Sequence, residues 1–400
     1  MRGPERFTAA EALGDRVGQL RHLALIALAA GAALCLVGTL FDGGGFLHSY
    51  LYAYVFWTGV TAGSLGLLML HHVAGGGWGF VLRRPLEAAS RLLPLMLLLS
   101  IPILLNIPKL YEWAAPGAGG DHELRLKAAY LNVSFFVGRT VFYFALWIGI
   151  AYFLNKWSAA QDESDDPRLF HKLNLLSAGG IVAYVLSVTF AIVDWVMSLA
   201  PHWNSSIIGL LFVASQALSA LSVMLVLVAF LAGGDSLMDR VPKMSVRDLG
   251  NLLLAMVMLW AYLSFSQYLI TYSGNTAEEA AWYAQRRGGG WGAVGLLLIP
   301  LHFALPFLIL LVPAVKRDIR RIAKVAAFLV LVRLLDLFWW VTPTFHSRLS
   351  ISINDFGAPL LIGGLWVLLW LRELQKRPLL PVHDPRLQAT WHLTEAPSHG

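Results

Sequence analysis

The chain has 400 residues, of which 57% are hydrophobic and 14% are charged. With this few charged and this many hydrophobic side chains, a soluble protein of this length could hardly cover its surface with polar groups. The composition therefore excludes an ordinary soluble enzyme. The formal net charge of +6 does not indicate a nucleic-acid partner, because the basic residues lie in the connections between apolar segments. We therefore expect an integral membrane protein.

Ten apolar segments are long enough to cross the hydrocarbon core of a bilayer, which takes about 20 helical residues. In chain order they cover residues 21–40, 49–71, 91–107, 130–154, 173–199, 205–231, 249–272, 291–315, 322–341 and 356–371. The sequence thus predicts an all-α integral membrane protein with ten transmembrane helices. A cytoplasmic segment over 1–20 precedes the transmembrane domain over 21–372, and a loosely ordered cytoplasmic tail follows over 373–400.

The lysine and arginine residues are distributed unevenly between the two sides of this topology. Counting from the N-terminus, 22 fall on the side of both termini, 6 on the opposite side and 2 within spans. The positive-inside rule therefore places both termini in the cytoplasm. The charged N-terminal segment lacks a short apolar core followed by a small-residue cleavage site, so the first span is expected to remain in the protein.

The chain has one cysteine, Cys35, inside the first span. It therefore cannot form an internal disulfide, a c-type haem attachment or a cysteine-ligated cluster. Any redox centre that the chain serves must lie in a partner or be a mobile molecule.

A weak internal echo links the fifth and ninth spans. An aspartate precedes a proline by seven residues in both, at Asp194 and Pro201 and at Asp336 and Pro343. This spacing fits two related four-helix bundles, spans two to five over 48–200 and spans six to nine over 205–345, with the first and tenth spans peripheral. Chance in a chain rich in Pro and Trp explains the echo equally well.

Polar and ionisable residues gather toward the predicted outer ends of several spans. The candidate site residues are Arg139, Asp194, His202, Gln267, Glu279 and Asp336. A quinol headgroup needs a hydrogen-bond acceptor for each hydroxyl, a base and an apolar slot for its ring. Carboxylates, an imidazole and an amide at one depth would suit quinol oxidation with proton release to the outside.

Each of these residues also has a purely structural interpretation. Asp194 can be neutralised by Arg139 in a buried ion pair that only sets helix register. Asp336 can pair with Arg333 one turn before it. Glu279, with Glu278, can begin a surface helix capped by Thr276. His202, Trp195 and Trp203 can belong to an interfacial aromatic belt.

His71 and His72 end the second span at the predicted cytoplasmic boundary, beside a Gly-rich turn. Adjacent helical residues point about 100° apart, so the two cannot both bind one iron axially. A haem would need a further ligand such as His302. The remaining interpretations are a structural interfacial pair and part of an inner proton route.

The segments DWVMSLAPHWNSSIIG, FSQYLITYSGNTAEEAAWY, FWTGVTAGSLGLLMLHHVAGGGWG and LLDLFWWVTP together resemble one family. The chain is similar, over nearly all of its ten spans, to the ActF subunits of bacterial alternative complex III, a quinol:cytochrome c oxidoreductase with NrfD-like polytopic subunits. The resemblance implies two four-helix bundles plus peripheral helices in a bacterial inner membrane. It also implies a sister NrfD-like subunit, haem c subunits and an iron–sulfur subunit as partners.

In that family the sister subunit, ActC, is the better-supported quinol site, and ActF is described as quinone-binding by homology and as a possible proton conduit. The resemblance implies no covalently bound cofactor, quinone or quinol as the mobile substrate, and roles for the residues named above, His71 and His72 included. One departure stands at Ala200-Pro201-His202, where the family is expected to have Asp-Pro-His. If that carboxylate belongs to an outer proton exit, either Asp194 or Glu279 replaces it here or the route is weaker than in relatives.

Three functions compete on the sequence. The first is a subunit of an electron-transfer complex that binds quinone or conducts protons, with Arg139 keeping Asp194 ionised and Gln267 positioning the substrate. The second is a secondary transporter, which should have a polar site at the bilayer midplane, whereas the polar layer predicted here lies further out. The third is a structural anchor that docks the sister subunit.

Overall fold

The computed structural model describes residues 9–41, 45–164, 166–233, 242–379, 381, 384 and 386–387. Within these residues ten helical stretches are long and apolar enough to cross a membrane, as predicted. They are Gly14–Phe41, Gly45–Ala74, Gly77–Leu104, Val133–Gln161, Pro167–Leu199, Ile208–Ala232, Lys243–Gly274, Trp291–Leu311, Ile319–Thr344 and Asn354–Leu374. The chain is therefore an all-α protein of the multi-pass membrane type.

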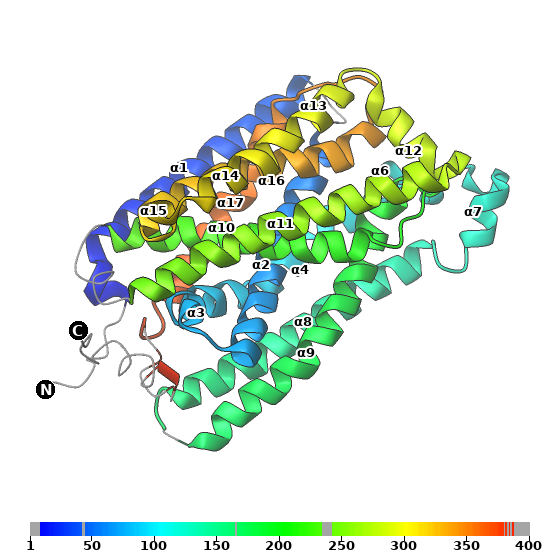
Figure 1. Ribbon diagram of the computed structural model, residues 1–400. Helices are drawn as coiled ribbons and strands as arrows, with labels where there is room; N and C mark the ends of the chain where they lie inside the picture. Colours follow the sequence, from blue (N-terminus) through cyan, green and yellow to red (C-terminus); the bar gives the residue numbers. More distant parts are fainter. Residues whose placement is uncertain are drawn as a thin grey trace, which may run out of the picture.

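Most spans are single long helices, and four, the third, fifth, eighth and ninth, consist of more than one helical element (Figure 1). The long helices are α1 (Ala9–Phe41), α2 (Gly45–Ala74), α8 (Val133–Gln161), α9 (Pro167–Trp195), α10 (Ile208–Ala232), α11 (Lys243–Gly274), α16 (Ile319–Val341) and α17 (Asn354–Leu374). The third span consists of α3 (Gly77–Ser90), α4 (Leu93–Leu99) and α5 (Ile101–Leu104). The eighth consists of α13 (Trp291–Leu298), the π-helix η5 (Ile299–Ala304) and α14 (Leu305–Leu311), and the fifth ends in the 3-10 turn η3 (Met197–Leu199).

Short elements connect these spans. They are α6 (Ile107–Leu110), η1 (Glu112–Ala114), η2 (Ala118–Gly120), α7 (His122–Lys127), α12 (Ala277–Arg287) and α15 (Pro313–Lys316), while the 3-10 turn η6 (Thr342–Thr344) ends the ninth span. In Figure 1, α7 and α12 lie at one end of the bundle, here called the α12 end, and α3 and α15 lie toward the other, here called the α3 end. The α12 end corresponds to the predicted outer side.

Local sequence signals begin three of the long helices. The side chain of Asn132 accepts the backbone N–H of Phe135 at 2.9 Å, and thereby satisfies one of the free donors at the start of α8. Asp166 and Asp318 do the same at the starts of α9 and α16. At α9 the cap is followed by Pro167, whose fixed φ suits the first helical position. These polar capping residues mark the first residue of each helix, which hydropathy alone does not locate.

The core lies around α2 and α10, which pack against each other at the centre of the bundle. In α2, 83% of the most apolar window is buried, against 22% in α1. α2 also packs against α3, α9 and α17, while α10 packs against α9, α11 and α16. The peripheral helices therefore keep a lipid-facing apolar side, and the two central helices have almost none.

Glycines allow α1 and α17 to pack backbone to backbone. A Cβ atom at Gly31 would lie 2.3 Å from the Leu361 backbone nitrogen, and one at Gly364 would lie 2.5 Å from that of Leu28. Close backbone approach through small residues is a common way for helices to associate in a membrane, where no hydrophobic force draws them together. The first and last spans therefore form one tightly packed pair.

We expect Gly364→Val to push this pair apart, because the new side chain would meet the Leu28 backbone. Overpacking of this kind typically costs about 1–3 kcal/mol. Cys35, the only cysteine, is buried where α1 meets Gly357. The variant should therefore show a lower unfolding temperature in detergent and faster maleimide labelling of Cys35. Gly18→Val is the matched control, because the space around Gly18 is open; equal labelling rates in the two variants would contradict the prediction.

Two segments differ from the sequence-based prediction. The third span begins at Gly77 rather than at residue 91, because the turn is confined to Gly75 and Gly76, which have positive φ, and helix α3 starts directly after it. The tail was predicted to be loosely ordered, yet Asp384 is fully buried against α3. Residues 1–8 and 388–400, which complete the two predicted cytoplasmic segments, lie outside the described residues.

Candidate functional site

The most complete polar group near the α12 end joins α8 to α9. Arg139 donates two hydrogen bonds to the Asp194 carboxylate, from Nε at 2.9 Å and from Nη2 at 2.7 Å. The Tyr143 hydroxyl donates a third at 2.8 Å. Asp194 is fully buried, and Arg139 is 8% exposed. Both oxygens of the carboxylate therefore accept hydrogen bonds from protein groups. These bonds offset the cost of burying a charged side chain inside a span.

Aromatic side chains cover the arginine of this pair. The Arg139 guanidinium lies 3.8 Å from the ring centre of Tyr130 and 4.2 Å from that of Phe135. It also donates to the Tyr130 carbonyl at 2.9 Å. Burial and the nearby Asp194 carboxylate raise the pKa of Tyr130 to about 12, so this phenol stays neutral. The predicted pairing of Asp194 with Arg139 is thus confirmed.

A second group lies deeper in the bundle, around Asp336 of α16. Arg333, one turn earlier, donates to the Asp336 carboxylate, as the structural interpretation predicted. Trp260 of α11 donates to the same oxygen at 3.3 Å, and the Nδ1 atom of His302 lies 4.0 Å from it. All four side chains are buried. Trp260 and His302 lie near the middle of their spans, so this group is close to the midplane rather than at the outer surface.

The eighth span presents His302 from its π-helix. Pro300 and Pro306 lack a backbone N–H, so regular α-helical hydrogen bonding cannot continue through this stretch. π-helical turns of this kind often mark functional positions. Among the described residues, neither ring nitrogen of His302 has a hydrogen-bond partner, and the ring lies against that of Trp260 with centres 3.6 Å apart. His302 therefore packs with Trp260 and Asp336, whereas the ring of His71 contacts His72, Trp78 and Phe80, so the described contacts do not bring the two histidines together.

The remaining outer candidates are separate from these two groups. His202 is half-buried and contacts the carboxylates of Glu123 at 2.9 Å and Asp121 at 3.4 Å. Gln267 is buried and accepts a hydrogen bond from Ser205. Glu279 lies with Glu278 in the first turn of α12, after Thr276. In the described part of the chain, no hydrogen bond joins these residues to Asp194 or Asp336, so the predicted outer layer is not one site.

Thr276 stands at the N-cap position of α12, as predicted, but its side chain makes no capping hydrogen bond. Near the other end of α12, Arg286 is buried, with its guanidinium 3.5 Å from the ring centre of Trp282, one turn earlier in the same helix. It donates to the Trp340 carbonyl of α16 at 2.8 Å. Burial lowers the pKa of Arg286 to about 9. This arginine therefore fastens α12 to the carbonyl end of α16, where a cation is favourable.

The largest charged cluster lies at the α3 end, and it was missed in the sequence. Glu87 accepts from Arg83 Nε at 3.0 Å, Arg84 Nη1 at 2.7 Å and the Ser158 hydroxyl at 2.6 Å. Arg83 also donates to Asp384 of the tail at 2.7 Å. All of these residues are buried. We call Arg83, Arg84, Glu87, Ser158 and Asp384 the α3 cluster.

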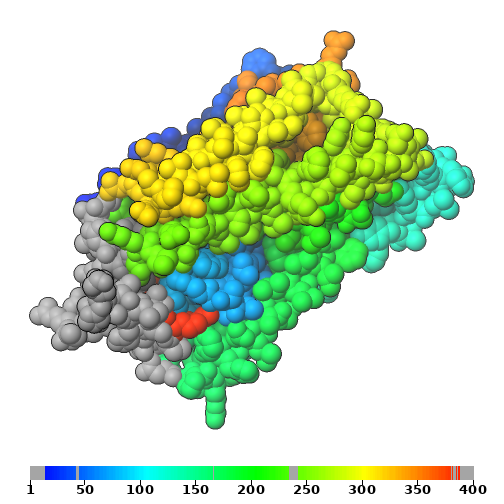
Figure 2. Space-filling model, in the orientation of Figure 1, coloured from blue at the N-terminus to red at the C-terminus, as the bar shows by residue number. Residues whose placement is uncertain are grey.

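The tail segment that reaches this cluster lies between α3 and the α8–α9 hairpin, seen as the red patch in Figure 2. Burial raises the pKa of Asp384, but the guanidinium groups of Arg83 and Arg386 outweigh burial and hold it below its usual value. Arg386 also donates to the carbonyls of His71 and His72 at the end of α2. The carbonyl groups at the end of α2 are thus hydrogen-bonded by a guanidinium that lies more than 300 residues further along the chain.

His71 and His72 are buried beside the α3 cluster. Among the described residues, none of their four ring nitrogens has a hydrogen-bond partner. Gly79 makes room for His71, because a Cβ atom there would lie 1.7 Å from its Nδ1. Gly79, in the first turn of α3 directly after the predicted Gly-rich turn, is therefore needed for the packing of His71. The two rings are 5.7 Å apart and tilted by 42°.

One sequence signal could have revealed the α3 cluster. Arg83 and Arg84 precede Glu87 by four and three residues, a spacing that places opposite charges on one helix face. The segment was instead assigned to a cytoplasmic connection because its charges lower its hydropathy. The contribution of Asp384 had no local signal, because its partner lies at the other end of the chain.

No protein-family model matches the chain, and no curated protein is similar to it.

Proposed function

We propose that the chain is a membrane subunit of a quinol-oxidising electron-transfer complex and that it contributes a path for protons through its own spans. The observation that carries this proposal is the arrangement of buried ionisable groups at three depths. These are the α3 cluster with His71 and His72, the group around Asp336 and His302, and the pair of Asp194 with Arg139. Ionisable residues inside spans are costly and typically mark ion or proton pathways.

The geometry supports proton transfer by this chain better than quinol binding at Asp194. Both carboxylate oxygens of Asp194 are occupied by Arg139 and Tyr143, and the residue is fully buried. A quinol would have to displace these partners to reach it. In this proposal quinone remains the mobile substrate of the complex and meets the sister subunit.

The wider arrangement in the proposal follows from packing and charge. Helix α2, the third span, α8 and α9 contact one another in a ring, as do α10, α11, the eighth span and α16, which supports two four-helix bundles. The excess of basic residues at the α3 end supports cytoplasmic termini, and the family resemblance is the basis for proposing a bacterial inner membrane. Because the chain has one cysteine, electrons would pass to haem c and iron–sulfur partner subunits.

The first experiment is a mild-detergent affinity purification of the chain from its native membrane, followed by haem spectra and quinol-oxidation assays. Co-purification with c-type haem, cluster proteins and quinol activity is the expected result. A chain that is folded, alone and haem-free would overturn the proposal.

In the intact complex in vesicles, we expect Asp336→Asn and Asp194→Asn each to lower the number of protons released per quinol oxidised. The reason is that each change removes a titratable group from one of the three depths. Quinol oxidation in the presence of an uncoupler should fall much less. Glu163→Gln, an exposed change at the α3 end, is the control. If both aspartate variants keep wild-type proton release and oxidation, the proposed proton path is wrong.

A second candidate function is a secondary transporter, because Asp336, Arg333 and His302 form a polar group near the midplane beside an interrupted span. Solute uptake by liposomes that contain only this chain would favour it. If instead the polar substitutions spare turnover while deletion of the chain prevents assembly, its role is that of a structural anchor.

A further inference from the structure

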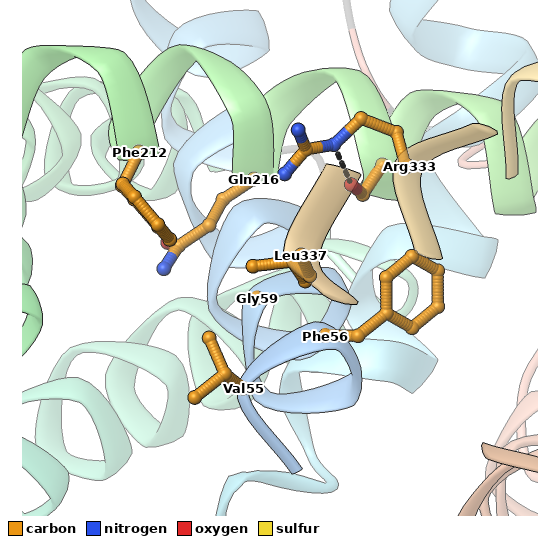
Figure 3. A pocket seen from close by; sticks show the side chains of 8 residues that line it. Val55, Phe56, Gly59, Phe212, Gln216, Arg333 and Leu337 are labelled. Atoms are coloured by element: carbon orange, nitrogen blue, oxygen red, sulfur yellow. Dashed lines mark hydrogen bonds between the residues drawn. The ribbon is translucent and has the colours of Figure 1, made fainter. Parts of the chain in front are cut away.

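A small cavity lies where α2, α10 and α16 meet, at the junction of the two halves of the protein. It is lined by Val55, Phe56, Gly59, Phe212, Gln216, Ser219, Arg333 and Leu337 and has a volume of about 10 Å³ (Figure 3). Roughly this volume is the smallest that holds one water molecule. The cavity is therefore sized for a single small ligand.

Its polar lining carries donors that the protein leaves unused. Arg333 donates from Nε to Ser219 at 3.3 Å, the bond drawn in Figure 3, and from Nη1 to Asp336. Among the hydrogen bonds of the described residues, Gln216 takes part through Oε1 and Arg333 through Nε and Nη1, so Gln216 Nε2 and Arg333 Nη2 make none. Both residues are at least nine-tenths buried. Buried donors of this kind normally have a partner, either protein or ordered water.

Two series of linked hydrogen bonds reach this cavity, one on each side of it. On one side, the Tyr184 hydroxyl of α9 donates to Gln216 Oε1 at 3.1 Å. On the other side, Arg333 leads to Asp336 and from there to Trp260 of α11. No direct hydrogen bond between Gln216 and Arg333 joins the two series, so one link is missing at the position of the cavity.

We propose that this cavity is a binding site for one ordered water molecule, which bridges Gln216 to Arg333 and Ser219. The site then joins α9, α10, α16 and α11 in one continuous hydrogen-bonded chain across the junction of the two halves. Gly59 is required on the α2 side, because a Cβ atom there would lie 3.0 Å from Gln216 Cγ. The water site does not depend on the proposed function, and it would be present equally in a transporter.

X-ray radiolytic hydroxyl-radical labelling of the purified full-length chain, read by mass spectrometry, tests this site. Radicals formed from a bound water oxidise the side chains next to it, even where bulk water has no access. Phe56, Phe212 and Leu337 are no more than 2% exposed, and we expect them to be labelled. Phe144 and Leu225, which are fully buried and do not line the cavity, should not be labelled. Equal labelling of the two sets would overturn the proposal.

Two variants separate a bound water from general loosening of the bundle. Gly59→Ala narrows the cavity, and Gln216→Leu removes its polar partner; both should reduce labelling of Phe56 and Leu337 to the level of Phe144. Gly149→Ala is the matched control, because the space around Gly149 is open, and it should keep wild-type labelling. Unchanged labelling in both cavity variants would also overturn the proposal. If either variant fails to fold, the comparison of cavity-lining with other buried residues in the wild-type protein still tests the proposal. None of these results depends on quinol oxidation or proton release.

Discussion

Glu87→Gln is expected to be among the most destabilising single substitutions in this protein. The change removes the negative charge that two buried arginines share, Arg83 at 3.0 Å and Arg84 at 2.7 Å, while the side chain keeps its size. Removing one partner of a buried ion pair leaves an uncompensated charge and typically costs about 3–5 kcal/mol. The loss should appear as a lower free energy of unfolding when the detergent-solubilised chain is titrated with SDS.

A comparison with the tail identifies which partner matters most. Asp384→Asn removes a carboxylate that contacts only one arginine of the α3 cluster, Arg83, so it should cost less than Glu87→Gln. Glu163→Gln, at an exposed position of the same end, should change stability by less than about 0.5 kcal/mol. If Glu87→Gln changes the free energy of unfolding as little as this control does, the prediction is wrong. The charges of the α3 cluster would then be hydrated in the folded protein rather than dependent on one another.

Asp194→Leu is expected to destabilise the fold strongly, and the second substitution Arg139→Met is expected to restore most of what is lost. Alone, the first change leaves the Arg139 guanidinium inside the bundle without its carboxylate, at a cost of about 3–5 kcal/mol. Replacing both partners by apolar side chains of similar volume is often close to neutral. SDS titration of the two single variants and the double variant measures this coupling.

The same double variant separates structure from function at the α12 end. A purely structural pair predicts that the folded double variant keeps both quinol oxidation and proton release in the intact complex. The proposed proton path predicts normal assembly with reduced proton release, because no titratable group remains at Asp194. A double variant as unstable as Asp194→Leu would contradict the pairing itself, since Tyr143 and Tyr130 would then account for the role of the carboxylate.

The span pattern could be predicted from the sequence because hydropathy is a local property that adds along the chain. The ten apolar stretches and the ion pair of Asp336 with Arg333, one turn apart, each follow from a single short segment of the chain. The pair of Asp194 with Arg139 was also predicted, because two opposite charges at one depth have few other partners in a membrane. The same reasoning wrongly placed Arg83 and Arg84 in a loop. The average hydropathy of a segment counts each charge as polar and takes no account of the partner that neutralises it.

What only the tertiary structure decided is which distant residues meet. His302 belongs with Asp336 and Trp260, not with His71, because the π-helix of the eighth span faces α11 and α16. Asp384 joins α3 across 301 positions of sequence, and a pairing at that separation has no local signal. The sequence by itself therefore determined an all-α, ten-span protein and its predicted orientation, since these depend on composition within each segment. The grouping of its buried charges depended on packing, because each charge is tolerated only where another helix supplies its partner.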